Sequence, residues 1–132
     1  MQQFSLEVNA PLTMEHIEMA LEPLLDNPSL GDVWLIEDDQ PIGYLVITWG
    51  WGIESGGKEA LIDELFVVPQ ARSQGLATAM LQAALNRAQE LGTKAVFLET
   101  ELDNPKSRDL YKRLGFQQES SVWLRALLEA ND

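Results

Sequence analysis

The sequence predicts an α/β fold: one mixed sheet whose first strands are antiparallel and whose middle strands are parallel. The first observation is a pair of apolar segments, 33–37 and 42–51, joined by a short polar turn, as in a hairpin. The second is a helix-like segment, 75–91, between the strand-like segments 60–68 and 94–100. A strand, a helix of this length and a strand form a crossover, so these two strands are expected to be parallel.

Length and composition indicate a single globular domain. The chain has 132 residues, of which 45% are hydrophobic and 23% charged, and it contains no repeat or linker-like run. We therefore expect one domain over residues 1–132. Apolar stretches stay well below the ~18 residues of a membrane span, and the N-terminus lacks the features of a signal peptide. A cytoplasmic location without membrane contact is expected.

Charge and cysteine content narrow the possible chemistry. The chain has 9 basic and 21 acidic residues, a net charge of −12, which repels nucleic acids and anionic lipids and favours cationic partners. An acidic surface is also simply a means of staying in solution. With no cysteine, the chain has no disulfide, no thiolate nucleophile and no cysteine-based metal site. No metal is expected.

The N-terminal third is expected to hold a short strand and one helix. Residues 4–8 alternate like a strand, and Thr13 is a suitable N-cap for the helix that follows. Pro23 is expected to bend this helix, and Asn27 with the proline after it should end it. The apolar stripe of the helix comprises Ile17, Leu21, Leu24 and Leu25.

Three strands are expected next. The polar segment 38–41 is the turn between the two strands of the hairpin, and 54–58 is a second turn. Residues 60–68 include apolar side chains at both odd and even positions, so both faces of a strand would be apolar; this predicts a strand in the middle of the sheet. One face of the 42–51 strand is expected to carry Leu45, Ile47, Trp49 and Trp51.

The second half of the chain is expected to be helix, strand, helix and a final strand. Helical spacing runs over 75–91, and Gly92 suits the position after its end. A helix over 105–114 should stop at Gly115. The tail segment 122–128 alternates passably and also fits a helix; a strand is the preferred interpretation.

The residues between the central strand and the next helix are suited to binding an anion. The first four backbone N–H groups of a helix lack partners within it, and the helix dipole adds positive charge there. Gly75 would let a ligand approach the backbone, and Arg72 adds a formal positive charge. The same residues are equally compatible with a glycine that only eases the turn and a solvated arginine.

The motif Arg-x-x-Gly-x-Ala after a strand ending in Val-Pro resembles the acetyl-CoA motif of the GNAT superfamily of N-acetyltransferases, Gln/Arg-x-x-Gly-x-Gly/Ala. The resemblance implies that backbone amides of this loop bind the pyrophosphate of CoA. It implies an acyl-CoA N-acyltransferase fold and acetyl-CoA as cosubstrate. The cofactor contacts implied in this segment are Arg72, Ser73, Gln74, Gly75, Leu76, Ala77 and Thr78.

A second segment strengthens the resemblance. Residues 104–116, NPKSRDLYKRLGF, are similar to the family pattern Asn-x-x-Ala-x-x-Phe-Tyr-x-x-Leu-Gly-Phe, with Ser107 and Leu110 as mild departures. The resemblance implies that Tyr111 protonates the departing CoA thiolate and that Asn104 contacts the pantetheine arm or its waters. It also implies that Val67 and Val68 offer backbone groups to this arm.

Glu64 is the candidate base. Acetylation needs a neutral amine, and alkyl amines are mostly protonated at neutral pH, with a pKa near ~10.4 for lysine. Glu64 is expected to lie on the central strand with Ile62 and Phe66 on its face and Asp63 on the opposite face. In the family a glutamate on this strand often serves as base through water. A structural carboxylate that accepts hydrogen bonds is the alternative.

The function expected from these features is direct transfer of acetyl from acetyl-CoA to a primary amine of a cationic small molecule or peptide. The alternative is a non-catalytic acyl-CoA-binding sensor. Trp49 and Trp51 could line an acceptor pocket, although at least one is expected in the core. A homodimer is possible, since dimers are frequent among similar proteins and the tail is apolar.

Overall fold

The computed structural model describes residues 14–72, 75–100 and 105–130. The strand predicted over 4–8 and the N-cap at Thr13 lie outside the described residues, as do the predicted cofactor contacts Ser73, Gln74 and Asn104.

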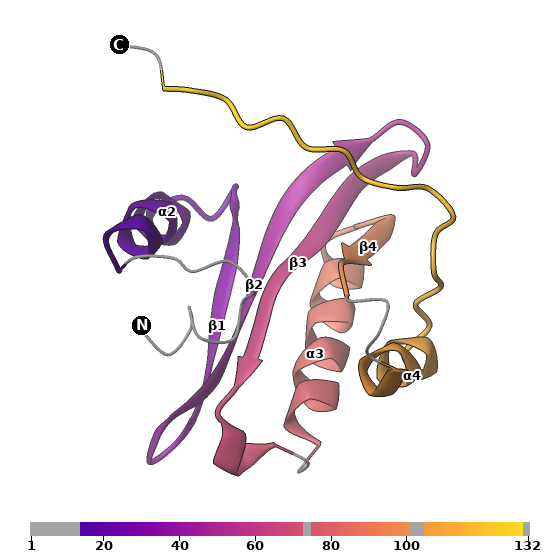
Figure 1. Cartoon of the computed structure of the whole chain (residues 1–132). Helices are drawn as coiled ribbons and strands as arrows, with labels where there is room; N and C mark the ends of the chain where they lie inside the picture. The colour runs from indigo at the N-terminus through magenta and orange to yellow at the C-terminus, as the bar shows by residue number, and fades with distance from the viewer. Residues whose placement is uncertain (1–13, 73–74, 101–104, 131–132) are drawn as a thin grey trace.

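One four-stranded sheet organises the molecule, in the order β1-β2-β3-β4 (Figure 1). Its strands are β1 (Gly31–Asp38), β2 (Gln40–Gly52), β3 (Gly57–Val67) and β4 (Ala95–Leu98). The first three strands are antiparallel, whereas β3 and β4 are parallel. The mixed sheet and the hairpin expected from the sequence are therefore confirmed, and β3 is an inner strand.

Three helices accompany the sheet: α2 (Met14–Asp26), α3 (Leu76–Glu90) and α4 (Pro105–Arg113). In Figure 1, α2 lies beside β1, whereas α3 lies along β3 and β4 with α4 next to it. A short 3₁₀ turn, η1 (Pro69–Ala71), joins β3 to the segment that leads into α3. The three helices predicted in these regions are confirmed, and Pro23 lies inside α2.

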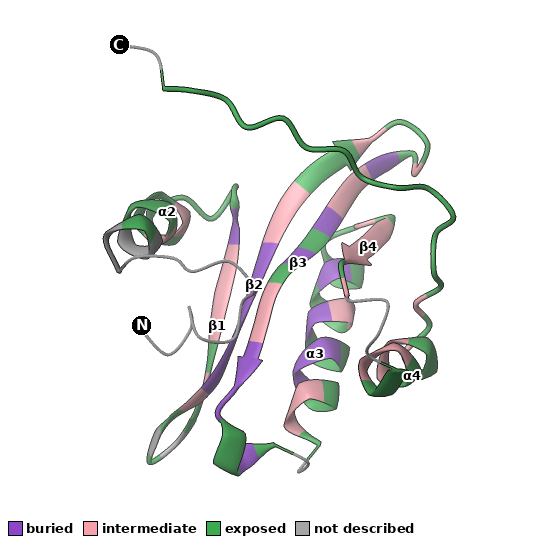
Figure 2. Ribbon diagram, viewed as in Figure 1, coloured by how far each residue is buried: buried purple, intermediate pink, exposed green. Residues whose placement is uncertain are grey.

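The core lies between the sheet and α3, where the buried segments of Figure 2 face one another. Leu45 and Ile47 of β2 and Leu81 of α3 are completely buried, and the small side chains of Ala60 and Ala84 are also buried. Each of the three large side chains contributes about 1.5–3 kcal/mol of transfer free energy. This packing fixes α3 against β3, and with it the start of the helix beside the end of the strand.

Both α3 and α4 end in the same glycine-based motif. Gly92 and Gly115 have positive φ angles of 79° and 101°, which favour glycine. After α4, Gly115 donates its N–H to the carbonyl of Lys112, and Phe116 donates to that of Tyr111, both at 3.0 Å. The Leu-Gly-Phe segment is thus a helix cap that brings Phe116 back to Tyr111.

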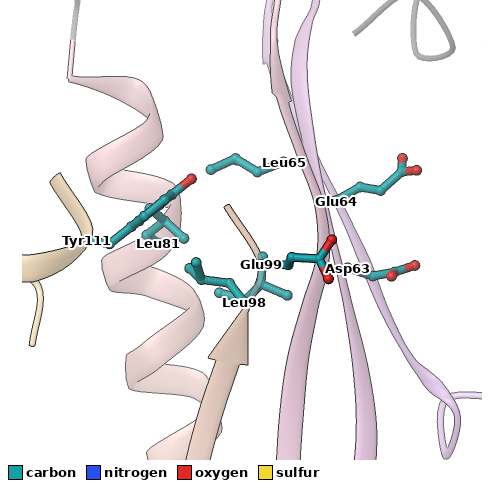
Figure 3. Close-up of a pocket in the computed structure, with 8 residues that line it drawn as sticks. Asp63, Glu64, Leu65, Leu81, Leu98, Glu99 and Tyr111 are labelled. Carbon is teal, nitrogen blue, oxygen red and sulfur yellow. The ribbon is translucent and has the colours of Figure 1, made fainter. Parts of the chain in front are cut away.

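A β-bulge in β3 contradicts one prediction. Glu64 pairs with Val46 and Ile62 pairs with Ile47, so Asp63 has no partner on β2. The extra residue shifts the alternation of side chains along β3. Asp63 therefore points to the same side of the sheet as Glu64 (Figure 3), and Ile62, which pairs with Ile47 of the α3-facing core, lies on the other side.

The strand predicted over 122–128 is wrong. Residues 121–130 form no regular secondary structure, and all of them are exposed. A strand needs a neighbour for its backbone groups, and among the described residues no segment pairs with this one.

Candidate active site

The two parallel strands separate beside the middle of β3. β4 pairs with β3 only from Glu59 to Ile62, whereas β3 continues to Val67. Val68 donates its N–H to the carbonyl of Ile42 on the β2 side, at 2.8 Å. Because successive backbone groups of a strand point to opposite edges, the N–H groups of Leu65 and Val67 face the side that β4 has left. Among the described residues, no strand pairs with this edge of β3 beyond Ile62, so the edge is open there.

Val67 and Val68, the two valines expected to offer backbone groups to a cofactor, already use part of their backbone within the chain, and cofactor binding by either stays a prediction. The amide of Val68 is already used by β2. The carbonyl of Val67 accepts a hydrogen bond from Nε of Arg72 at 2.9 Å. Only the N–H of Val67, together with the backbone of Leu65, remains directed toward the open edge.

Arg72, in the turn after β3, contacts two residues at the end of that strand. Besides its bond to Val67, its guanidinium carbon lies 5.8 Å from the ring centre of Phe66. The loop therefore leaves the strand in a defined direction, which brings the chain to the start of α3. A cofactor-binding role for Arg72 stays a prediction.

The start of α3 has the backbone geometry of an anion site. Gly75 is the N-cap residue, with φ of 77°, and among the described residues no side chain caps the helix start. A Cβ atom at Gly75 would have no heavy atom of the described residues within 4 Å, so these residues leave space above it. Leu76, Ala77 and Thr78 form the first helical turn, and Thr78 is exposed. Cofactor binding by this turn stays a prediction that the geometry supports.

A pocket lies where β3 and β4 separate (Figure 3). It brings the two predicted catalytic residues, from β3 and α4, into one site with two further carboxylates. The lining residues are Ile62, Asp63, Glu64, Leu65, Leu81, Leu98, Glu99 and Tyr111. Within the described part of the chain, the charged residues of this lining are all acidic.

Glu64 is held by a residue that the sequence analysis did not identify. The hydroxyl of Tyr44, a β2 residue that is only 4% exposed, donates a hydrogen bond to Oε2 of Glu64 at 2.7 Å. Tyr44 pairs with Phe66, two residues beyond Glu64, and their rings lie 5.7 Å apart. The register between β2 and β3 could have indicated this contact from the sequence, because it places Tyr44 and Glu64 diagonally opposite each other on one face of the sheet.

Tyr111 reaches the pocket from α4, on the other side of β3 from Glu64 (Figure 3). Its ring meets that of Phe116 edge to face, with centroids 6.0 Å apart. Burial raises the pKa of the Tyr111 phenol above its usual value of 10.0, because the phenolate would be poorly solvated. Tyr111 is therefore protonated at neutral pH and can donate a proton.

A model of the acetyltransferase (GNAT) family matches residues 3–116, most of the chain. The chain belongs to the GNAT family.

Individual relatives of this GNAT chain agree with the family match. An uncharacterized N-acetyltransferase of Methanocaldococcus jannaschii is 31% identical, over 70% of this chain and 47% of the relative. One of Bacillus subtilis is 29% identical, over 81% of this chain and 72% of the relative. The chain thus spans about half the length of the archaeal relative.

Solved structures show the same fold. An integron cassette protein from the mobile metagenome of Cole Harbour Salt Marsh superposes with a TM-score of 0.84 at 33% identity, over 98% of this chain and 81% of that protein. A possible acetyltransferase from Clostridium difficile superposes with a TM-score of 0.80 at 15% identity, which is a likeness of fold.

The two tryptophans of the GNAT chain have different environments. Trp49 packs against the core, as expected for at least one of them, and Nζ of Lys58 lies 4.4 Å from its ring centre. Trp51 is 74% exposed. Across the described residues, no cluster of three metal-binding side chains occurs, and no helix is long and apolar enough to cross a membrane.

Proposed function

We propose that this GNAT protein transfers the acetyl group of acetyl-CoA directly to a primary amine. The observation that carries the proposal is the open edge of β3, with a hydrogen-bonded carboxylate on one side of the strand and a protonated phenol on the other. A thioester bound at that edge would have a proton acceptor and a proton donor on opposite sides. Because the chain has no cysteine, no thioester intermediate on the protein is involved.

Each group has a defined task in the proposed reaction. Glu64, directly or through a water molecule, removes a proton from the ammonium group of the acceptor. The free amine attacks the carbonyl carbon of the thioester, and the N–H of Val67 or Leu65 stabilises the charge on the carbonyl oxygen. The C–S bond then breaks, and Tyr111 gives its proton to the CoA thiolate. The nitrogen loses its second proton as the amide forms, and this proton returns through solvent to the Tyr111 phenolate.

The pyrophosphate of CoA would bind at the start of α3. The open space at Gly75 and the uncapped N–H groups of the first turn support this assignment. The pantetheine arm would contact the apolar side chains of the pocket, Leu65, Leu81 and Leu98.

The acceptor is proposed to be a cationic amine. Asp63 and Glu64 project from the same face of β3 because of the bulge, and Glu99 lines the same pocket. Three carboxylates at the pocket, in a chain of net charge −12, attract a positive acceptor and repel anionic ones.

The test is release of free CoA from acetyl-CoA by the purified 132-residue chain, with a panel of amines that includes polyamines, amino sugars and peptides with free N-termini. We expect a cationic amine to give the fastest release. Tight binding of acetyl-CoA without release for every amine would favour the second candidate, an acyl-CoA sensor, for which the same open edge and helix start would suffice.

A further inference from the structure

A line of contacts runs from the proposed base to the turn before α3. The hydroxyl of Tyr44 donates a hydrogen bond to Oε2 of Glu64 at 2.7 Å, and the ring of Tyr44 lies 5.7 Å from that of Phe66. The guanidinium carbon of Arg72 lies 5.8 Å from the centre of the same Phe66 ring. Nε of Arg72 donates a hydrogen bond to the carbonyl of Val67 at 2.9 Å. The line thus joins a carboxylate of the pocket to the residue that follows η1.

The middle of this line of contacts is buried, whereas its two ends reach solvent. Tyr44 is 4% exposed and Phe66 5% exposed, while Glu64 is half-buried and Arg72 is exposed. Tyr44 lies directly opposite Phe66 in the sheet, and Glu64 and Phe66 are two residues apart on β3, so all three share one face. Close-packed interiors transmit strain, because a ring cannot move without moving its neighbours. A displacement of the Phe66 ring would therefore displace the hydroxyl that holds Glu64.

We propose that Phe66 and Arg72 are positioning residues of the acetyl-transfer reaction, which act through Tyr44 on the carboxylate of Glu64. Arg72 fixes the Phe66 ring from the turn, Phe66 fixes the ring of Tyr44, and the Tyr44 hydroxyl orients the carboxylate. A base must lie within hydrogen-bond reach of the proton that it removes, and a misplacement of about 1 Å can lower a rate by about 100-fold. This role rests on the proposed function, since Glu64 is a base only in that reaction.

The proposed role of Arg72 differs from the cofactor contact that the resemblance to the acetyl-CoA motif implies. A contact to a phosphate group needs a positive charge, which lysine also supplies. The positioning role needs Nε and a planar group that stacks on an aromatic ring, and lysine has neither. The substitution Arg72→Lys therefore separates the two roles.

The first test is steady-state kinetics of the 132-residue chain with acetyl-CoA and the best amine of the panel. We expect Arg72→Lys and Phe66→Leu to lower kcat by about fivefold and to leave the KM for acetyl-CoA within about twofold. Arg87→Lys, the same change at an exposed position of α3, is the matched control and should behave like the parent. An unchanged kcat in Arg72→Lys would overturn the proposal, and a raised KM for acetyl-CoA beside it would assign Arg72 to the cofactor.

The second test is a double-mutant cycle with Tyr44→Phe, which removes the hydroxyl that joins the two aromatic rings to Glu64. In this background, Arg72→Lys should have almost no further effect on kcat, because its influence has to pass through that hydroxyl. A general loosening of the fold would instead lower kcat further. Additive losses would therefore refute the transmission through Tyr44.

The third test needs no substrate. It follows the ¹³C carboxyl signal of Glu64 in labelled protein, assigned by its absence in Glu64→Gln. Arg72→Lys and Phe66→Leu should shift this signal, whereas Arg87→Lys should leave it in place. In the Tyr44→Phe background, Arg72→Lys should no longer shift it.

The carboxyl signal keeps the inference separate from the proposed function. Because Arg72 is exposed, Arg72→Lys should fold even if the buried substitution Phe66→Leu does not. A Glu64 signal that Arg72→Lys leaves unchanged would overturn the inference without bearing on acetyl transfer. A chain that shows the shift and acetylates no amine would refute the proposed function, while the connection between Arg72 and Glu64 would stand.

Discussion

At the scale of single residues, the site depends on the only two tyrosines of the chain: Tyr44 bonds to Glu64, and Tyr111 lies on the other side of β3 from Glu64. Tyr44 is buried and gives its hydroxyl hydrogen to Glu64, whereas Tyr111 lines the pocket as a neutral phenol. A hydrogen bond to a charged group contributes about 1.5–3 kcal/mol. That is enough to hold the Glu64 carboxylate in one orientation.

Glu64→Gln keeps the shape of the side chain and removes the proton acceptor. If Glu64 is the base, kcat/KM should fall by roughly 10²–10⁴-fold. The loss should become smaller as pH rises, because free amine is then available without a base. The measurement is a pH–rate profile with one good amine. A variant as active as the parent at neutral pH would assign Glu64 a structural role.

Tyr44→Phe keeps the buried ring and removes the hydroxyl that orients Glu64. We expect kcat to fall by about tenfold, less than in Glu64→Gln, since a half-exposed carboxylate can be rehydrated. In the double variant Tyr44→Phe/Glu64→Gln the effect of the first change should nearly vanish, because it acts through Glu64. Additive losses in this double-mutant cycle would contradict the positioning role.

Tyr111 can be titrated alone in the Tyr44→Phe variant, which has no other tyrosine. Ultraviolet absorbance should show phenol ionisation above the usual pKa of 10.0, since burial disfavours the phenolate. The raised pKa also makes the unfolding free energy depend on pH. The neutral phenol contributes fully to stability below pH 10, and this contribution is lost as pH rises through the higher pKa of the folded state. A midpoint at or below 10 would contradict this environment.

Tyr111→Phe tests the same residue as an acid. The variant should lose less activity than Glu64→Gln, because a thiolate is a tolerable leaving group without protonation. Its affinity for CoA should change little, and raising the pH should not restore the rate. Activity equal to that of the parent would leave Tyr111 as a packing residue against Phe116.

At the scale of elements, three local devices create the site: the bulge at Asp63, the early end of β4 and the left-handed glycine before α3. The bulge turns a second carboxylate to the side of Glu64. The early end of β4 frees the edge of β3 beyond Ile62. Gly75 begins α3 beside that edge, because the packing of Leu81 fixes the helix against the sheet.

Two substitutions at Gly75 separate backbone strain from cofactor contact. Asn tolerates the positive φ of this position, whereas a β-branched Val does not. Gly75→Val should therefore lose about 1–2 kcal/mol of unfolding free energy, and Gly75→Asn should lose less. Both variants place atoms in the open space and should weaken CoA binding, measured calorimetrically, by about tenfold or more. Normal CoA affinity in a stable Gly75→Asn variant would falsify the assignment of the pyrophosphate to this helix start.

At the scale of the whole molecule, charge is the dominant property. The net charge of −12 creates a negative field that attracts cations toward the acidic pocket. Salt screens such a field, with a Debye length of about 10 Å at 0.1 M. For a cationic acceptor, kcat/KM should therefore fall as ionic strength rises, with kcat less affected. A rate that salt increases, or a preference for an anionic acceptor, would show that the charge argument is wrong.

The sequence by itself determined the order of the strands and helices from α2 to α4, the mixed sheet and the family. Alternation, helical spacing and glycine positions are local signals, and the two motifs around Gly75 and Tyr111 are contiguous stretches of chain. Only the tertiary structure decided the side to which Asp63 points and the contact between Tyr44 and Glu64. Both depend on the register between strands, which one strand read alone does not contain. The tail shows the same limit, because alternation over 122–127 predicts a strand but a strand forms only where a neighbouring edge accepts its backbone groups.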